Sequence, residues 1–402
     1  MSNDISDRTL PAGWAQKQLG EVCKVISGST PKTSVSDYWG GEIPWLTPND
    51  LSKNRNKVVE GGERYITQLG FDSCSTQMVP KGSVLFTSRA PIGYVAIAGV
   101  PMCTNQGFKS AVPNEDIGTA FLYWQLQNLT DDVRSRASGT TFLEISGRGF
   151  AATTLVVPPL REQEKIVEVL EEQLSRLDAA LASVRAVREK STRFRRSLLH
   201  AAFTGALTGA DSENSNTDVR VSVFEDLFDL ISNDRRQVKQ KDYKKSGKFP
   251  VVDQGEETVG GFIDDGDLLF DGALPVIVFG DHTRRLKFID FPFVVGADGT
   301  KLIQCKEVVL PRYGFYHLEA AEFRNRGYAR HFGELKKVMF WLPSIQLQEK
   351  IVEILEEQFL RLEASLAVVD GIEKKALALR RSLLHAAFTG NLTKEWRGGA
   401  YV

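Results

Sequence analysis

Residues 163–173 read QEKIVEVLEEQ, and residues 348–358 repeat this text as QEKIVEILEEQ. Residues 195–205 read RRSLLHAAFTG, and residues 380–390 repeat those letters without a change. Each repeat begins 185 residues after its original, from 163 to 348 and from 195 to 380, so no insertion divides the two copies. This duplication predicts two similar units related by a pseudo-two-fold axis. Such a chain can present two related surfaces to a two-fold symmetric partner, and duplex DNA or a pair of identical subunits would qualify.

Both copies have the pattern of a long helix, because apolar residues recur at alternating four- and three-residue steps. In the first copy these residues are Leu170, Leu174, Leu177, Leu181 and Val184. In the second copy they are Leu355, Phe359, Leu362, Leu366 and Val369. Prolines precede both segments, and Gly205 and Gly390 follow them, as is common at helix ends. We therefore expect two helices, within residues 156–209 and 341–394, that pack together as an antiparallel coiled coil.

The composition bounds the class of protein. A chain of 402 residues is long enough for two or three domains. The formal net charge is −1, so DNA binding would need local basic clusters or charge from a partner. The four cysteines form no Cys-x-x-Cys pair, which favours reduced thiols over a zinc site. The polar first residues and the lack of a long apolar run predict neither a signal peptide nor a membrane span, so we expect a cytoplasmic location.

Two other stretches, residues 1–155 and 219–340, are rich in glycine, proline and aromatic residues and contain short β-like runs. We expect each to be a compact α+β domain, and their sequences have little in common. Residues 210–218 are small and polar, as in a linker, and residues 395–402 form a tail. The predicted order is therefore variable domain, helix, linker, variable domain, helix and tail.

These motifs resemble the specificity subunit of type I restriction–modification systems. The helix starts carry the resemblance at residues 157–166 and 342–351, and the helix ends carry it at residues 197–205 and their copy. Shorter matches open or punctuate the variable domains, namely LPAGW at residues 10–14, IPW at 43–45, TNQGF at 104–108 and SGTT at 138–141. The resemblance covers the whole chain, but its motifs are specific mainly in the helices.

The resemblance implies a non-catalytic subunit with two target-recognition domains of mixed α/β structure. Each domain would read one half of a bipartite, asymmetric double-stranded DNA site, and the helix pair would act as a ruler between the halves. Two methylation subunits would dock on the helices and methylate adenine N6 with S-adenosylmethionine. Restriction subunits would add translocation and cleavage with ATP and magnesium. No cofactor is expected in this chain itself.

Candidate DNA-binding residues in the second domain are mostly basic, and basic side chains suit phosphates or guanine edges. They are Arg235, Arg236, Lys239, Lys241, Tyr243, Lys244, Lys245, His282, Arg284, Arg285, Lys301, Arg326, Tyr328 and Arg330. In the first domain, asparagine and glutamine suit adenine edges, and serine and threonine suit phosphates. The candidates there are Ser29, Thr30, Lys32, Arg55, Lys57, Arg89, Asn105, Gln106, Lys109 and Thr140. Each set also fits solvated surface loops or structural turns.

The unchanged helix ends suggest two copies of one partner-docking surface, since core packing alone tolerates drift between apolar residues. The candidates are Leu198, Leu199, His200, Phe203, Leu383, Leu384, His385 and Phe388. The two histidines lack companions for a metal site, and the alternative role of the whole segment is packing.

Motifs for phosphate loops, dinucleotides and adenine methylation are absent from the sequence. Two other classes stay open at this point. One is a structural adaptor with two heads on a coiled-coil strut that binds protein only, and the other is an enzyme with unrecognised motifs.

Overall fold

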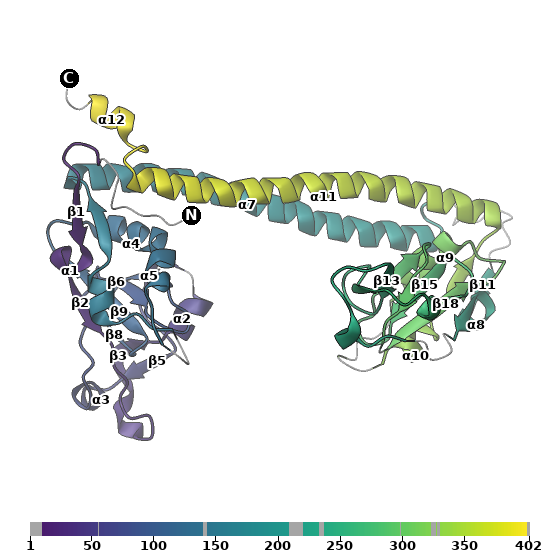
Figure 1. Cartoon of the computed structure of the whole chain (residues 1–402), viewed down its shortest axis with the longest axis horizontal. Coiled ribbons are helices and arrows are strands. Elements are labelled where there is room, and N and C mark those ends of the chain that lie inside the picture. Colours follow the sequence, from purple (N-terminus) through teal and green to yellow (C-terminus); the bar gives the residue numbers. More distant parts are fainter. Residues whose placement is uncertain are drawn as a thin grey trace. The chain divides into compact units, whose positions relative to one another are not determined.

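The computed structural model describes residues 10–54, 56–139, 143–208, 220–232, 237–297, 299–322, 327 and 330–399. The chain divides into two compact units, which we call the first unit (residues 1–183 and 372–402) and the second unit (residues 184–371). Each unit combines one globular head with part of each of two long helices (Figure 1). None of the described helices is both long and apolar enough to cross a membrane. The predicted linker at residues 210–218 lies outside the described residues.

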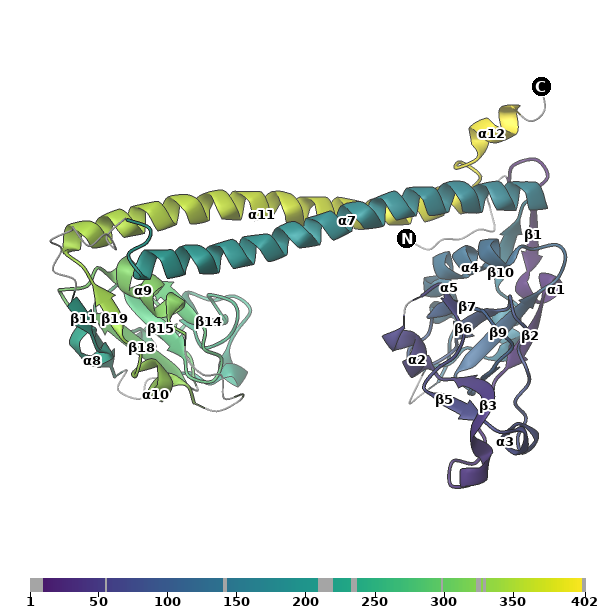
Figure 2. The same cartoon turned by 180° about the vertical axis from the view of Figure 1, so that it is seen from behind.

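The two long helices are α7 (Leu160–Phe203) and α11 (Ile345–Phe388), each of 44 residues. They run antiparallel, as both views show (Figures 1 and 2). In the first unit Arg380 of α11 pairs with Asp178 of α7 at 2.9 Å, and in the second unit Arg188 pairs with Asp370 at 2.5 Å. Their ends follow the predicted signals, because Gly205 and Gly390 both adopt left-handed backbone angles, with φ of 83° and 76°.

The predicted coiled-coil seam is confirmed. The seam residues that are buried are Leu170, Leu174, Val184, Leu355, Phe359 and Val369. The other four seam residues, Leu177, Leu181, Leu362 and Leu366, are half-buried. The remaining faces carry charged residues together with exposed apolar side chains such as Phe194, Leu360 and Leu377. The helices gain stability chiefly from the apolar seam and from the heads.

The first head, residues 10–157, holds a five-stranded sheet in the order β2-β9-β6-β7-β4 and a three-stranded sheet in the order β5-β3-β8. The large sheet consists of β2 (Cys23–Ser27), β9 (Phe108–Pro113), β6 (Val84–Thr87), β7 (Val95–Ala98) and β4 (Val58–Val59). The small one consists of β5 (Arg64–Ile66), β3 (Trp39–Leu46) and β8 (Cys103–Thr104). The helices are α1 (Leu19–Val22), α2 (Pro48–Lys53), α3 (Gln68–Asp72), α4 (Thr119–Asn128), α5 (Thr130–Ser135) and α6 (Gly147–Ala151).

The second head, residues 220–342, repeats this strand order with a different sequence, but its larger sheet has no counterpart of β4 among the described residues. Its larger sheet has the order β12-β18-β15-β16, from β12 (Phe228–Ile231), β18 (Thr300–Cys305), β15 (Val276–Gly280) and β16 (Leu286–Ile289). Its smaller sheet has the order β14-β13-β17, from β14 (Gly261–Ile263), β13 (Phe249–Val252) and β17 (Val294–Val295). The helices are α8 (Phe224–Leu227), α9 (Pro311–Ala320) and α10 (Phe332–Leu335).

The pairing directions also match between the heads. In each small sheet the central strand, β3 or β13, pairs antiparallel with one neighbour and parallel with the other. A two-stranded ladder closes each head just before its long helix. It pairs β1 (Ala15–Gln18) with β10 (Thr154–Val157) in the first head, and β11 (Arg220–Ser222) with β19 (Phe340–Leu342) in the second. The expectation of two α+β domains with little shared sequence is therefore confirmed as a duplicated fold.

Each long helix starts in one unit and ends in the other, where its last turn enters a core. Phe388 at the end of α11 is 7% exposed and packs edge-on against Phe121 of α4, with ring centroids 5.5 Å apart. At the end of α7, Phe203 meets Tyr313 of α9 in the same way at 5.3 Å. The two units are therefore built alike, from one head, the start of one helix and the end of the other.

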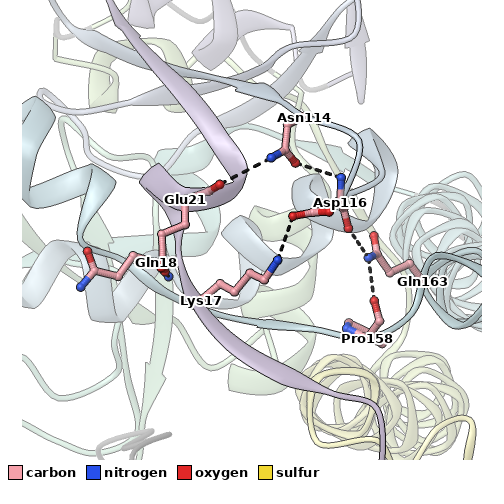
Figure 3. Close-up of polar contacts among 7 residues, drawn as sticks. All are labelled: Lys17, Gln18, Glu21, Asn114, Asp116, Pro158 and Gln163. Atoms are coloured by element: carbon pink, nitrogen blue, oxygen red, sulfur yellow. Dashed lines mark hydrogen bonds and ion pairs between the residues drawn. The ribbon is translucent and has the colours of Figure 1, made fainter.

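A glutamine joins each head to the start of its helix. The Gln163 amide donates to the carbonyl oxygens of Asp116 and Pro158, both at 2.8 Å (Figure 3). It also accepts from the Gly118 N–H at 2.8 Å. Its copy, Gln348, donates to Val308 and Pro343, both at 3.0 Å, and accepts from the Leu310 N–H at 2.9 Å. Both side chains are buried, at 1% and 0% exposure, so each one satisfies three backbone groups that water cannot reach.

The tail after α11 closes the first unit through a buried carboxylate. Glu162, 3% exposed, accepts from the Trp14 indole at 2.9 Å and from the Thr393 hydroxyl at 2.7 Å. The Arg397 guanidinium lies 2.9 Å from the same carboxylate, and it belongs to the short helix α12 (Lys394–Gly399). Part of the predicted tail is thus an ordered component of the first unit.

We predict that Arg397→Ala will destabilise the first unit by about 3–5 kcal/mol, because it leaves the Glu162 charge buried without a counter-charge. The double variant Arg397→Ala/Glu162→Gln should recover most of this loss, since a neutral amide can accept from Trp14 through its oxygen and donate to the Thr393 hydroxyl through its nitrogen. Calorimetric unfolding of the three proteins measures the effect. Equal stability of the single and double variants would show that the ion pair is unimportant.

His317 of α9 offers a pH-dependent test in the second unit. Burial lowers its pKa from 6.5 to about 4, and its Nε2 accepts from the Trp341 N–H at 2.9 Å, which requires the neutral ring. The folded pKa lies below the unfolded one, so the stabilisation is complete above pH 6.5 and is lost as the pH falls toward 4. The first unit uses Gln125 in place of this histidine, donating to Val156 at 3.0 Å.

We therefore predict that the free energy of opening of residues 311–342 will fall by about 2–3 kcal/mol more in the wild-type protein than in His317→Gln when the pH drops from 7 to 4.5. Hydrogen exchange of peptides from this segment at the two pH values measures the difference. The comparison cancels the titration of carboxylates common to both proteins, and the same pH slope in both would refute the prediction.

Candidate nucleic-acid interface

A cleft of 810 Å³ in the second head gathers part of the predicted basic cluster. It is lined by Lys239, Lys241 and Lys244 together with the acidic Asp242, Asp264 and Asp265. Lys244 pairs with Asp264 at 2.8 Å, and this contact holds the pKa of the Asp264 carboxyl below its ordinary value. The side chains of Lys239 and Lys241 are exposed and have no partner among the described residues. These two lysines are therefore the cations of this cleft that are free to meet a phosphate.

The hairpin between β15 and β16 carries the second group of candidates. Arg284 adopts the left-handed region with φ of 59°, which is rare for residues other than glycine and is common near functional sites. The Thr283 hydroxyl donates to the Gln254 carbonyl at 2.7 Å, and Arg285 pairs with Glu256 at 2.9 Å. The Arg284 side chain is exposed at the tip and has no partner among the described residues.

The base of this hairpin is fixed by a buried aspartate. Asp281, 3% exposed, accepts from the backbone N–H groups of His331 and Phe332 at 2.9 and 2.8 Å. The connection is therefore anchored to α10 while its tip stays open to solvent.

The equivalent hairpin of the first head lies between β6 and β7 and has the same peculiarity. Ala90 adopts a left-handed backbone with φ of 46°, next to Arg89, which lies 3.4 Å from Glu144. Both heads thus place a left-handed non-glycine residue at the same topological position, with different side chains around it.

The structure brings together four of the candidates in the first head that are distant in sequence. The Thr30 hydroxyl donates to the Gln106 side chain, and the Ser29 N–H donates to the Thr104 carbonyl at 2.9 Å. The Asn105 side chain accepts from the Gly107 N–H at 2.9 Å, which fixes the turn that exposes Gln106. Lys32 follows this site and is exposed. This cluster offers amide and hydroxyl groups on one surface, as base-edge recognition requires.

Two DNA-binding predictions need correction, and a third, for Tyr243, stays a prediction because this side chain is only half-buried. Lys109 is 7% exposed and lies 3.3 Å from Glu144, so it is buried in the sheet and cannot reach a nucleic acid. Lys57 pairs with Glu171 of α7 and lies over the Trp124 ring at 5.8 Å, so it links the head to the helix. Tyr243 packs into an apolar cluster of the second head.

The remaining candidates divide into two groups. His282, Lys301, Lys245 and Arg330 lie at half-buried or exposed positions of the second head. Six others lie outside the described residues: Arg55, Thr140, Arg235, Arg236, Arg326 and Tyr328.

One feature of the first head was missed from the sequence. The Arg64 guanidinium lies 3.5 Å from the ring centroid of Trp39, and Trp39 packs edge-on against Trp45. Stacked aromatic and arginine groups of this kind suit contacts with nucleic-acid bases. The available signal was the presence of aromatic residues at 38, 39, 45 and 65 and basic residues at 53, 55, 57 and 64, which carries no spacing rule of its own.

Most of the apolar side chains at the helix ends, which were predicted to form a partner-docking surface, pack into the hydrophobic cores of the heads. Leu199 and Phe388 are 5% and 7% exposed, and Phe203, Leu198, Leu383 and Leu384 pack against the same cores. The prediction of a partner surface is wrong for Leu199 and Phe388, because their side chains are covered by the heads. His200 and His385 remain exposed, and no group of metal-binding side chains occurs among the described residues.

A different part of the repeat stays on the surface in both copies. Glu164, Glu168 and Glu172 of α7 are exposed, as are their counterparts Glu349, Glu353 and Glu357 of α11. Their identity is not explained by packing inside either unit.

A duplicated α+β head mounted on two shared helices defines a two-headed recognition scaffold. The family model for the type I restriction modification DNA specificity domain matches residues 11–182 and 216–366, so each head and the start of its helix are covered. The chain belongs to this family.

Individual relatives agree with this assignment. The chain is 25% identical over 445 residues to the EcoKI specificity subunit of Escherichia coli K12, covering 98% of this chain and 92% of the relative. It is 39% identical over 163 residues to the MjaIX specificity subunit of Methanocaldococcus jannaschii, covering 40% of this chain and 38% of the relative. The matches to the EcoR124I and HindI subunits likewise span only 39% and 37% of those proteins.

Solved structures share the fold. One, described as the structural basis of complex assembly and conformational transition of the type I R-M system, has a TM-score of 0.75 at 17% identity, covering 96% of this chain and all of the other. The HsdS subunit from Thermoanaerobacter tengcongensis has a TM-score of 0.55 at 18% identity, covering 96% and 99%.

We predict that Lys239→Ala and Lys241→Ala will each make the dependence of DNA affinity on salt shallower by about one unit on logarithmic axes, as expected for one lost phosphate contact. Lys244→Ala should change the slope less, because Asp264 already neutralises this lysine. Fluorescence anisotropy of labelled duplex DNA across a salt series measures all three. Equal slopes in the three variants and the wild type would exclude the cleft from the interface.

Proposed function

We propose that this chain selects a bipartite, asymmetric double-stranded DNA site, with each head reading one half. One observation carries the proposal. The heads share a strand topology, yet they bring different residues to the equivalent hairpin, Arg89 and Ala90 in one and residues 282–285 in the other. A shared fold with different hairpin residues is what two recognition domains with different DNA targets would have. The two half-sites should therefore differ in sequence.

The helices are proposed to dock two methylation subunits. The exposed glutamates at 164, 168 and 172 recur at 349, 353 and 357, so two identical partner copies would find the same three glutamates on each helix, with Glu172 and Glu357 each paired to an arginine four residues on. Restriction subunits would join the same complex. The cofactors of such a complex, S-adenosylmethionine, ATP and magnesium, would belong to these partners.

The isolated chain is proposed to have no catalysis of its own. Its role is to place the partner methyltransferase on one adenine in each half-site. A protein-only adaptor, the competing proposal, would show no preference among DNA sequences.

We predict that replacing residues 223–339 with the corresponding head of a relative will change one half-site and leave the other unaltered. The exchange keeps the β11–β19 ladder, and the incoming head must supply the N–H and carbonyl groups that Gln348 binds and the ring that Phe203 meets. Mapping adenine methylation in cells that also carry the partner subunits reads both half-sites at once.

The control is the unmodified chain in the same cells, which should methylate a single split sequence. A change in both half-sites would contradict independent reading, and methylation without any sequence preference would contradict the proposed function itself. Methylation by the purified chain alone would contradict the non-catalytic role.

A further inference from the structure

A second cleft of 810 Å³ lies entirely within the second unit and is lined in part by a long helix. The lining comes from three elements: α7 with Thr192, Arg195, Arg196, Leu199 and His200; the β15–β16 hairpin with residues 283–286; and the end of α9 with residues 318–322. Leu199 and Leu318 are buried at 5% and 1% exposure and give the cleft an apolar floor. Polar and charged side chains occupy the rest of its wall.

Two of the four arginines in this wall are already engaged. Arg195 forms a bidentate contact with Glu319 at 3.0 and 3.1 Å and lies 3.8 Å from the centroid of the Phe359 ring. Arg285 pairs with Glu256 at 2.9 Å. These two side chains hold the wall together and have little capacity for a ligand.

The other two arginines, Arg196 and Arg284, are exposed and have no partner among the described residues. Glu322, at the end of α9, is the one acidic lining residue without a described partner, so the free groups carry a surplus of positive charge. The two consecutive arginines therefore have different roles. Arg195 fixes the helix to the head, and Arg196 is available to a ligand.

We propose that this cleft binds a phosphate of the DNA backbone, and that Arg196 makes α7 a direct DNA contact as well as a spacer. Arg196 and Arg284 would approach the phosphate from the helix and from the hairpin. The apolar floor suits the deoxyribose that flanks each phosphate, and arginine matches phosphate oxygens through paired N–H groups. The proposal rests on the proposed DNA-reading function and adds a contact outside the head to it.

Such a contact would fix the orientation of the second head's hairpin on the duplex. A phosphate contact positions a protein without reading a base, so it should act equally on cognate and unrelated DNA. Arg284, at the tip of this hairpin, has a left-handed backbone conformation, so the hairpin already has a defined shape without DNA.

The test is salt-dependent binding of the chain, assembled with its methylation partner, to labelled duplexes with and without the mapped site. Arg196→Ala should make the slope of log affinity against log salt shallower by about 0.9. Between 50 and 200 mM KCl the variant should therefore lose about 3-fold less affinity than the wild type, and Arg196→Ala/Arg284→Ala about 10-fold less. Arg196→Lys should keep the wild-type slope, and Glu322→Gln should tighten binding.

Lys190→Ala is the matched control, because it removes an exposed charge from α7 outside the cleft. An unchanged slope for Arg196→Ala, with specific binding by the wild type intact, would overturn this inference alone. Loss of site-specific binding in the wild type would instead reject the proposed function.

Two further outcomes would also overturn the inference. Failure of Arg196→Ala to assemble with the methylation partner would assign this side chain to a protein interface. Saturable binding of inorganic phosphate at constant ionic strength that needs Arg196 but leaves DNA affinity unchanged would assign the cleft to free phosphate.

Discussion

The structure depends on the burial of each long helix at both of its ends, in two different cores. At its start, each helix is tied to its own head by one glutamine, Gln163 or Gln348, whose three hydrogen bonds satisfy the loop before α4 or α9. At its end, each helix inserts a phenylalanine into the other unit, against Phe121 or Tyr313. Neither head can therefore complete its core without the helix that follows the other head.

This exchange accounts for the glutamine and the phenylalanine that recur in the two long helices, although the heads have diverged in sequence. The helix starts must present the same glutamine to a backbone loop, and the helix ends must fit the same aromatic position. The heads can change on their exposed hairpins, because those tips take no part in the glutamine hydrogen bonds or the phenylalanine ring contacts that join the helices to the cores, although the β15–β16 hairpin lines a cleft with α7. Specificity can therefore vary while the scaffold stays constant, which is the property a recognition subunit needs.

The helices, their seam and the duplication were predictable from sequence, because apolar spacing and glycine stops are local signals. The burial of Phe388 was not, since it depends on Phe121, which is remote in sequence and is brought near by the fold. Residue type alone also misplaced Lys109, whose position in a sheet buries it beside Glu144. Arg196 was overlooked for a related reason. Only the structure shows that Arg195 binds Glu319, whereas Arg196 has no partner among the described residues.

We propose that two independent readers are held by a shared helix pair whose length sets the spacing of the half-sites. Each unit contains parts of both helices, so both helices must be lengthened by the same number of residues. The test variant therefore carries Ala-Ala-Leu-Ala after Ala182 in α7 and after Ala367 in α11. Four residues add about 6 Å, which corresponds to one to two base pairs of DNA. Adenine-methylation mapping should then find the same two half-sites with a spacer longer by one or two base pairs. Full methylation at the original spacing would contradict the account.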